Sequence, residues 1–394
     1  MTDSNEPINI LASTESASRI SRRLFLAGGL AAGVGGSALL SACGNSGTTD
    51  TPAAGGTTAG PVEDKLEMYT WGEYNSPKVI KEFETATGAK FTLSSYNSNE
   101  QLIAKLTAAQ GTSGYDLVVP TGPFVPALVA NDLIQPLDLS RIPNFKNLEP
   151  QYTDQPWDPG NAHSVCKDWG TTGYVYDTTK ISAEMTTWQD FLDVAMGEAS
   201  GQVSVLDSPD NICGLYLWAN DINWMTEDSA QLEAARAFLV NELSTHVKAF
   251  DSYPGGGGIQ QGTYALAHAW NGDARQGLLG VDNPDDWKWV FPGPRTEIWM
   301  DTYAIPVGAP HPNAAYAWID NVLDPKVSLQ ELEYIGYHMG VKDIQPLAED
   351  AGVERLDMVF FTPEQVATME SGELNSAQTT RVEISNEMKA AAGG

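Results

Sequence analysis

The sequence predicts an α/β fold of two lobes, and three observations support this expectation. Strand-like and helix-like segments alternate from residue 65 onward, as in sheets that are covered by helices on both faces. About 330 residues follow residue 64, which is more than one hydrophobic core usually holds. Stretches at 170–177 and 300–308 are typical of strands that cross between two α/β sets.

The first α/β set has clear local signals. Ser76 is an expected helix cap, Pro77 lies in the first helical turn and Gly88 is a helix terminator. The alternation predicts a mainly parallel sheet. The expected elements are a strand at 65–71, a helix at 75–88, a strand at 89–96, a helix at 98–111 and a short buried strand at 115–120.

Ligands of such sheets bind at the carboxyl ends of the strands. The turns at 69–74, 94–97 and 121–124 are therefore expected along one cleft. The second set is expected to include a strand-containing segment at 201–210, a helix at 229–243, a segment at 264–273 and a helix at 312–323, with the four glycines 255–258 in a loop.

The N-terminal region has the pattern of an export signal. Arg22 and Arg23 precede an apolar, glycine- and alanine-rich run from 24 to 40, and Leu40-Ser41-Ala42-Cys43 resembles a lipobox. A membrane-spanning helix is the alternative, but the run is short of the roughly 20 residues that a span needs. We expect a twin-arginine-like lipoprotein signal at 1–42, with Cys43 lipidated, and export to the outer face of the cytoplasmic membrane.

The rest of the chain divides by composition. Residues 43–63 are rich in glycine, threonine and alanine and predict a flexible tether. We expect lobe 1 to comprise 64–171 and 301–345, and lobe 2 to comprise 172–300 and 346–394.

The chain is strongly acidic, with 51 Asp and Glu against 22 Lys and Arg and a formal net charge of −29. Such a surface repels nucleic acid and favours a cationic ligand, although solubility or a salty habitat explains acidity equally simply. Cys166 and Cys213 remain as an even pair in an oxidising compartment, where a disulfide and two buried thiols are both plausible.

Catalytic motifs are scarce. The five histidines are scattered, and no nucleophile or phosphate-binding motif is present. The acids Asp207 and Asp210 leave a secreted glycoside hydrolase open as an alternative.

Eleven tryptophans are more informative, because aromatic faces and carboxylates together hold organic ammonium ions. Trp188 serves as a control, since its own W-x-D pattern is typical of an ordinary helix start.

Six motifs resemble the polyamine-binding proteins of spermidine and putrescine uptake transporters. They are YTWGEY (69–74), SSYNSNE (94–100), YDLVVP (115–120), AWNGD (269–273), WMDTYAIPVGA (299–309) and IGY (335–337), and the resemblance runs from about residue 66 to 375. It implies a type II solute-binding fold, with two α/β lobes joined by hinge strands that close on the ligand. It further implies delivery to a membrane ABC permease, no catalysis, no cofactor and no metal, and we expect a monomer.

Carried over by position, the resemblance implies a binding cleft. Aromatic walls and carboxylates would enclose a cation in it. The implied residues are Trp71, Glu73, Tyr74, Thr121, Trp270, Asp273, Trp299, Asp301 and Tyr337, with Tyr96, Phe124, Asp207, Asp210 and Asn375 as further candidates.

Departures from the family pattern favour a short ligand. Ser208 and Asn211 stand where the spermidine-binding branch has acids, and Asn375 stands where it has glutamine. Fewer carboxylates suit a diamine such as putrescine better than a triamine, because an unpaired buried ammonium is costly. Another small cation, an amino acid or a sugar is the alternative ligand for the same fold.

Overall fold

The computed structural model describes residues 60–109 and 113–393. The expected signal at 1–42 and the lipidation site Cys43 lie outside the described residues. Within the described ranges, no helix is both long and apolar enough to cross a membrane.

The strands form one ten-stranded sheet in the order β2-β1-β3-β9-β4-β7-β5-β6, with β10 added beside β9 and β8 beside β4. The bounds are β1 (Lys65–Trp71), β2 (Lys90–Tyr96), β3 (Leu117–Val118), β4 (Ser164–Asp177), β5 (Val203–Leu206), β6 (Val247–Asp251), β7 (Leu266–Trp270), β8 (Trp287–Val290), β9 (Thr296–Ala304) and β10 (Met369–Ser371).

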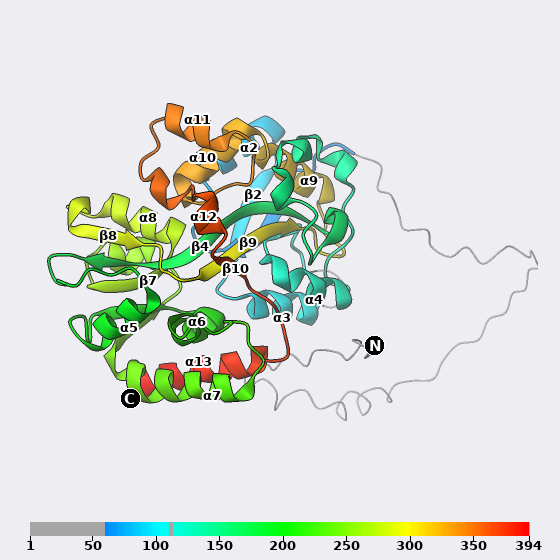
Figure 1. Ribbon diagram of the computed structural model, residues 1–394. Helices are drawn as coiled ribbons and strands as arrows, with labels where there is room; N and C mark the ends of the chain where they lie inside the picture. Colours follow the sequence, from blue (N-terminus) through cyan, green and yellow to red (C-terminus); the bar gives the residue numbers. More distant parts are fainter. Residues whose placement is uncertain (1–59, 110–112, 394) are drawn as a thin grey trace, which may run out of the picture. The chain divides into compact units, whose positions relative to one another are not determined.

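Helices cover this sheet above and below in the view of Figure 1. They are α2 (Pro77–Thr87), α3 (Asn99–Ala109), α4 (Val125–Ala130), α5 (Trp188–Met196), α6 (Pro209–Ala219), α7 (Ser229–Phe238), α8 (Asn271–Gly280), α9 (Pro312–Val322), α10 (Pro325–Ile335), α11 (Ile344–Asp350), α12 (Pro363–Val366) and α13 (Gln378–Ala392).

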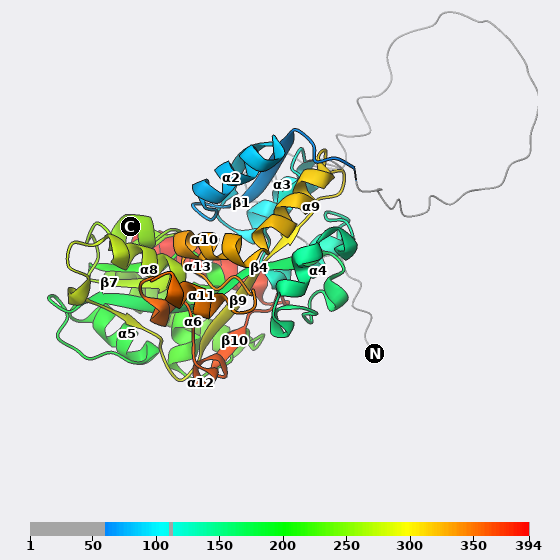
Figure 2. The same cartoon turned by 90° about the horizontal axis from the view of Figure 1, so that it is seen from above.

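The expected two-lobed α/β fold is present. β4 is buried along its whole length; residues 164–171 pair with β9, and 172–177 pair with β7 and β8. One hydrophobic core gathers around Leu66, Trp169 and Trp318, and a separate one gathers around Tyr174, Trp188 and Trp218. Figures 1 and 2 show β1 and α2 beside the much later α9, so the first of these cores is built from two distant parts of the chain.

The sheet is less parallel than expected. The outer pairs β1–β2, β1–β3, β5–β6 and β5–β7 are parallel, but β9 is antiparallel to β3 and β4, and β4 is antiparallel to β7 and β8. Antiparallel pairing follows because β9 and β4 run between the lobes in opposite directions. This arrangement places β9 at the centre of the sheet.

The local signals of the first helix are confirmed. The Ser76 hydroxyl accepts a hydrogen bond from the Val79 amide, and Gly88 ends α2 with a left-handed φ of 79°. That φ favours glycine because a side chain would crowd the backbone there. Trp188 likewise opens α5 behind the Thr187 cap, where its ring is fully buried.

Two other expectations are resolved by the structure. Cys166 and Cys213 are both free, and each lies buried in a different hydrophobic core. The glycines expected in a loop form a π-helical turn, Gly255–Ile259. A side chain would not fit at Gly258, because its Cβ would lie 1.7 Å from the Tyr264 ring.

Candidate functional site

A cavity of about 270 Å³ opens beside the carboxyl ends of the first-lobe strands. The turns that follow β1, β2 and β3 line it, as the sequence predicts, together with β9 and the first turns of α6 and α8. Thirteen of the fourteen predicted cleft residues line this cavity: Trp71, Glu73, Tyr74, Tyr96, Thr121, Phe124, Asp207, Asp210, Trp270, Asp273, Trp299, Asp301 and Tyr337.

Asn375 is the predicted cleft residue that does not line the cavity. Its amide nitrogen donates to the Met225 carbonyl at 2.7 Å, and its oxygen accepts from Arg381 at 2.8 Å. The amide that does reach the cavity wall belongs to Gln378, three residues later, in the first turn of α13. Asn375 precedes α13 and Gln378 begins it, so the sequence could locate this region but not the side chain that faces the cavity.

Aromatic rings form the walls. The Trp71 ring packs edge-on against Tyr96 at 4.7 Å between centroids, and its indole nitrogen donates to the Val119 carbonyl at 3.1 Å. On the β9 side, Trp299 meets Tyr337 at 4.7 Å with an interplanar angle of 80°. Such edge-to-face contacts hold each ring in a fixed orientation.

Gly170 on β4 leaves the space that the Trp299 ring occupies. A Cβ at residue 170 would lie 2.4 Å from Cζ2 of Trp299 and 2.4 Å from the side-chain oxygen of Asn271. The missing side chain on β4 therefore leaves room for the indole ring of Trp299.

β9 presents three consecutive same-face residues to the cavity, Glu297, Trp299 and Asp301. Side chains alternate between the two faces of a strand, so positions two apart share a face. Sequence reasoning identified Trp299 and Asp301 but missed Glu297, because the strand was expected to begin at residue 300. The two-residue spacing was the signal that could have found it.

The cavity lining is entirely acidic in its charged groups. Among the described residues that line it, none is a Lys, Arg or His, and seven are acids: Glu73, Glu100, Asp207, Asp210, Asp273, Glu297 and Asp301. Burial raises the pKa values of Asp273, Glu297 and Asp301 to about 7 in each case. A buried carboxylate without a cation is costly, so this lining favours the arrival of positive charge.

A buried ion pair lies behind Asp301. The ammonium of Lys167 is 2.6 Å from the Asp168 carboxylate and 3.7 Å from the centre of the Tyr74 ring, and both members of the pair are fully buried. The Tyr74 hydroxyl donates to Asp168. Because Lys167 compensates Asp168, the negative charge of Asp301 faces the cavity without a cation of its own.

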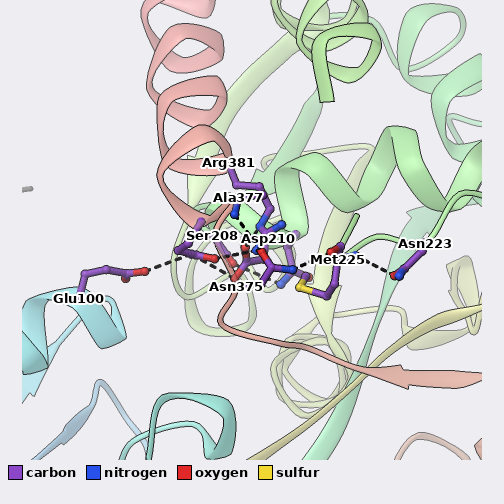
Figure 3. A network of polar contacts seen from close by, with 10 residues as sticks. Glu100, Ser208, Asp210, Asn223, Met225, Asn375, Ala377 and Arg381 are labelled. Atoms are coloured by element: carbon purple, nitrogen blue, oxygen red, sulfur yellow. Dashed lines mark hydrogen bonds and ion pairs between the residues drawn. The ribbon is translucent and has the colours of Figure 1, made fainter. Parts of the chain in front are cut away.

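Two of the seven acids do have cationic partners, both from α13. Lys389 pairs with Asp207, and the guanidinium of Arg381 donates to Asp210 at 2.7 Å. Figure 3 shows Arg381 and Asp210 at the centre of a polar network that includes Asn375, with Glu100 approaching it from α3. The hydrolase alternative assigned catalysis to Asp207 and Asp210, but these carboxylates are held in ion pairs.

The remaining acids have neutral partners. Glu73 accepts a hydrogen bond from the Tyr334 hydroxyl at 3.0 Å, and its backbone has a left-handed φ of 52°. A non-glycine residue in that conformation is strained, and such strain often occurs at functional sites. Glu100 accepts from the Gln378 amide at 3.2 Å, which links α3 to α13 beside the cavity.

Comparison with known proteins identifies the family. Residues 78–354 match the family described as bacterial extracellular solute-binding protein. This chain belongs to that family. The members are solute-binding proteins rather than enzymes.

Similar solute-binding proteins agree with the fold. The spermidine/putrescine-binding periplasmic protein of Escherichia coli is 32% identical over 72% of this chain and 80% of its own length. The putrescine/agmatine-binding protein of Pseudomonas aeruginosa is 27% identical over 82% of this chain and 90% of its own. The structure of a spermidine/putrescine ABC transporter substrate-binding protein from Streptococcus pneumoniae is 26% identical, covers 84% of this chain and all of its own, and has a TM-score of 0.69. The resemblance seen in the motifs is thus confirmed.

Proposed function

We propose that this solute-binding protein captures an aliphatic polyamine outside the cytoplasmic membrane and delivers it to an ABC transporter. The observation that carries the proposal is the cavity lining, which combines aromatic rings with acids and includes no base among the described residues. Indole faces suit both methylene groups and ammonium ions, and carboxylates form charge-assisted hydrogen bonds with ammonium. The names of the similar proteins from Escherichia coli and Pseudomonas aeruginosa support the same ligand class.

A short diamine fits better than a triamine. The two acids at the α6 end, Asp207 and Asp210, are already compensated by Lys389 and Arg381, so they offer less to a third ammonium group. An amino acid fits less well than either, because its carboxylate would find no lining cation. A neutral sugar would leave the buried carboxylates uncompensated.

Capture would proceed by closure of two lobes, 64–171 with 301–345 and 172–300 with 346–394. Several hydrogen bonds cross this boundary beside the cavity, among them Tyr337 to Asp273 and Gln378 to Glu100. Contacts of this kind form only when the lobes approach, so a ligand that needs both lobes would favour the closed form. β4 and β9, which run through both lobes, would serve as the hinge strands.

Anchoring would use Cys43. Signal removal before this cysteine and its lipidation would leave 43–63 as a tether with a reach of roughly 25 Å. Replacing Cys43 by Ala should move the protein from the membrane fraction to the soluble fraction. Retention of the variant in the membrane fraction would contradict this part of the proposal.

The ligand class is tested by calorimetric titration of the purified protein with putrescine, spermidine, choline and a neutral sugar. We expect saturable binding of putrescine, weaker binding of spermidine, and no binding of the sugar. Heat from the sugar alone would overturn the proposed ligand class.

A further inference from the structure

The cavity wall near the start of α6 holds three acids that differ in their partners. Asp207 pairs with Lys389, whose side chain is about one third exposed, and Asp210 pairs with Arg381, which is fully buried. Arg381 is fixed further by hydrogen bonds to Asn375 at 2.8 Å and to Gln378 at 3.1 Å (Figure 3). The charges of Asp207 and Asp210 are therefore compensated by the protein itself.

Glu297 is the third acid, and its partner is neutral. Its side chain accepts a hydrogen bond from the Thr172 hydroxyl at 2.7 Å, and the residue is only 8% exposed. Within residues 60–109 and 113–393, no Lys, Arg or His forms an ion pair with it. An ionised carboxylate in such a place is stabilised only when a cation joins it.

The position of Glu297 along β9 relates it to Asp301. The two carboxylates lie on the same strand face with Trp299 between them, and four residues of strand separate their Cα atoms by about 13 Å. Both side chains lie in the cavity wall, so a ligand that lies along the Trp299 ring has one carboxylate beyond each end.

We propose that Glu297 holds one ammonium group of the ligand and Asp301 the other, while Asp207 and Asp210 hold none. This inference rests on the proposed polyamine function and refines it. The distance between the Glu297 and Asp301 carboxylates on β9 then selects for ligand length, and it favours a short linear diamine with a charge at each end. The sequence suggested Asp207 and Asp210, at the start of α6, as the acids for this ammonium group. The proposal assigns that role to Glu297 on β9 instead.

The test compares 1,4-diaminobutane with n-butylamine, which has the same carbon chain and a single ammonium group. Calorimetry gives the affinity of the wild-type protein and of Glu297→Gln for each amine. We expect Glu297→Gln to lose about tenfold or more in diamine affinity, because one charge-assisted contact is removed. Its butylamine affinity should stay within about twofold of wild type, since Asp301 still holds that single charge.

Glu370→Gln is the matched control. Glu370 on β10 is in register with Glu297, but it pairs with Arg295 and does not line the cavity. Its removal should leave both affinities unchanged. Asp207→Asn tests the second half of the inference, and the diamine affinity should change by no more than about threefold.

The outcomes separate the inference from the proposed function. A wild-type protein that binds neither amine nor spermidine defeats the proposed function. A wild-type protein that binds the diamine while Glu297→Gln keeps its full preference over butylamine defeats only the inference. Equal losses for both amines in Glu297→Gln would also overturn it, because they indicate a structural role, and Glu297→Asp with restored diamine preference would support it.

Discussion

The Tyr337 hydroxyl donates a 2.5 Å hydrogen bond to the Asp273 carboxylate, which joins the segment after α10 to the first turn of α8. The Tyr337 hydroxyl oxygen also accepts a hydrogen bond from the backbone amide of Asp273 at 3.3 Å. Tyr337 also supports Trp299 with its ring edge, so one side chain positions both an acid and an aromatic wall of the cavity.

The Trp299 ring should contribute strongly to ligand affinity. Trp299→Ala removes a hydrophobic wall and a cation–π contact, and we expect a loss of about 2–3 kcal/mol, roughly 30- to 150-fold in Kd. Titration with putrescine measures this loss. Trp188→Phe is the matched control: Trp188 is fully buried, and its nitrogen donates to the Arg295 carbonyl at 3.0 Å. Trp188→Phe should lower the unfolding temperature and leave the putrescine affinity unchanged. A loss of affinity in Trp188→Phe without a loss in Trp299→Ala would contradict the assignment of Trp299 to the binding site.

Gly170→Ala should weaken ligand binding by displacing the Trp299 ring. The added Cβ would lie 2.4 Å from the Trp299 ring, so the ring must move or the strands must separate. We expect a stability loss of about 1–3 kcal/mol in urea unfolding, together with weaker putrescine binding. Gly257→Ala is the control, because its Cβ would have only one ordinary contact, at 3.8 Å from Asp251. Unchanged affinity in Gly170→Ala would show that the position of Trp299 is not critical.

Binding should depend on pH. Burial raises the pKa values of Asp273, Glu297 and Asp301 to about 7, so protons leave these groups when a cation binds. Putrescine affinity should be highest above pH 7 and should fall by about tenfold per pH unit below it for each carboxylate that must ionise. Calorimetry in buffers of different ionisation enthalpy measures the released protons, and pH-independent affinity between pH 5 and 8 would contradict this.

The same raised pKa values should make the ligand-free protein less stable as pH rises, whereas they make ligand binding tighter. A carboxyl whose folded pKa lies above its unfolded value contributes stability at low pH and loses it as pH rises toward 7. The increase in unfolding temperature caused by putrescine should therefore be larger at pH 8 than at pH 5. Thermal unfolding at the two pH values, with and without putrescine, provides the measurement.

Cys166 and Cys213 should resist modification in the folded state. Both thiols are buried, and burial raises the pKa of Cys213 to about 12 and that of Cys166 above its usual range. Peptide mass spectrometry after iodoacetamide treatment should find both unmodified in the native protein and both alkylated in urea without reductant. Alkylation that requires reductant would indicate a disulfide instead.

Local signals predicted local structure well. The helix α2 begins after Ser76 and ends before Gly88 as expected, because caps act within a few residues of backbone. The turn residues of the cavity were also predictable, since Trp71 ends β1 and Thr121 follows β3, and the carboxyl ends of these parallel strands share an edge.

Long-range relationships were not predictable in the same way. Glu297 was missed because a charged residue weakens the strand signal at the start of β9, and only tertiary contact with Thr172 reveals it as a buried group. The compensation of Asp210 by Arg381 joins residues that are 171 positions apart, a relationship that no spacing pattern records. The antiparallel centre of the sheet likewise depends on strand order rather than on alternation.

The most direct test compares putrescine with 1,4-butanediol, which has the same four-carbon chain but no charge. Titration at pH 8 should give saturable one-site binding of the diamine and no measurable heat from the diol, because the cavity carboxylates need ammonium partners. Binding of the diol as tight as that of the diamine, or no binding of the diamine, would contradict the claim that this acidic, aromatic cavity is built for an aliphatic dication.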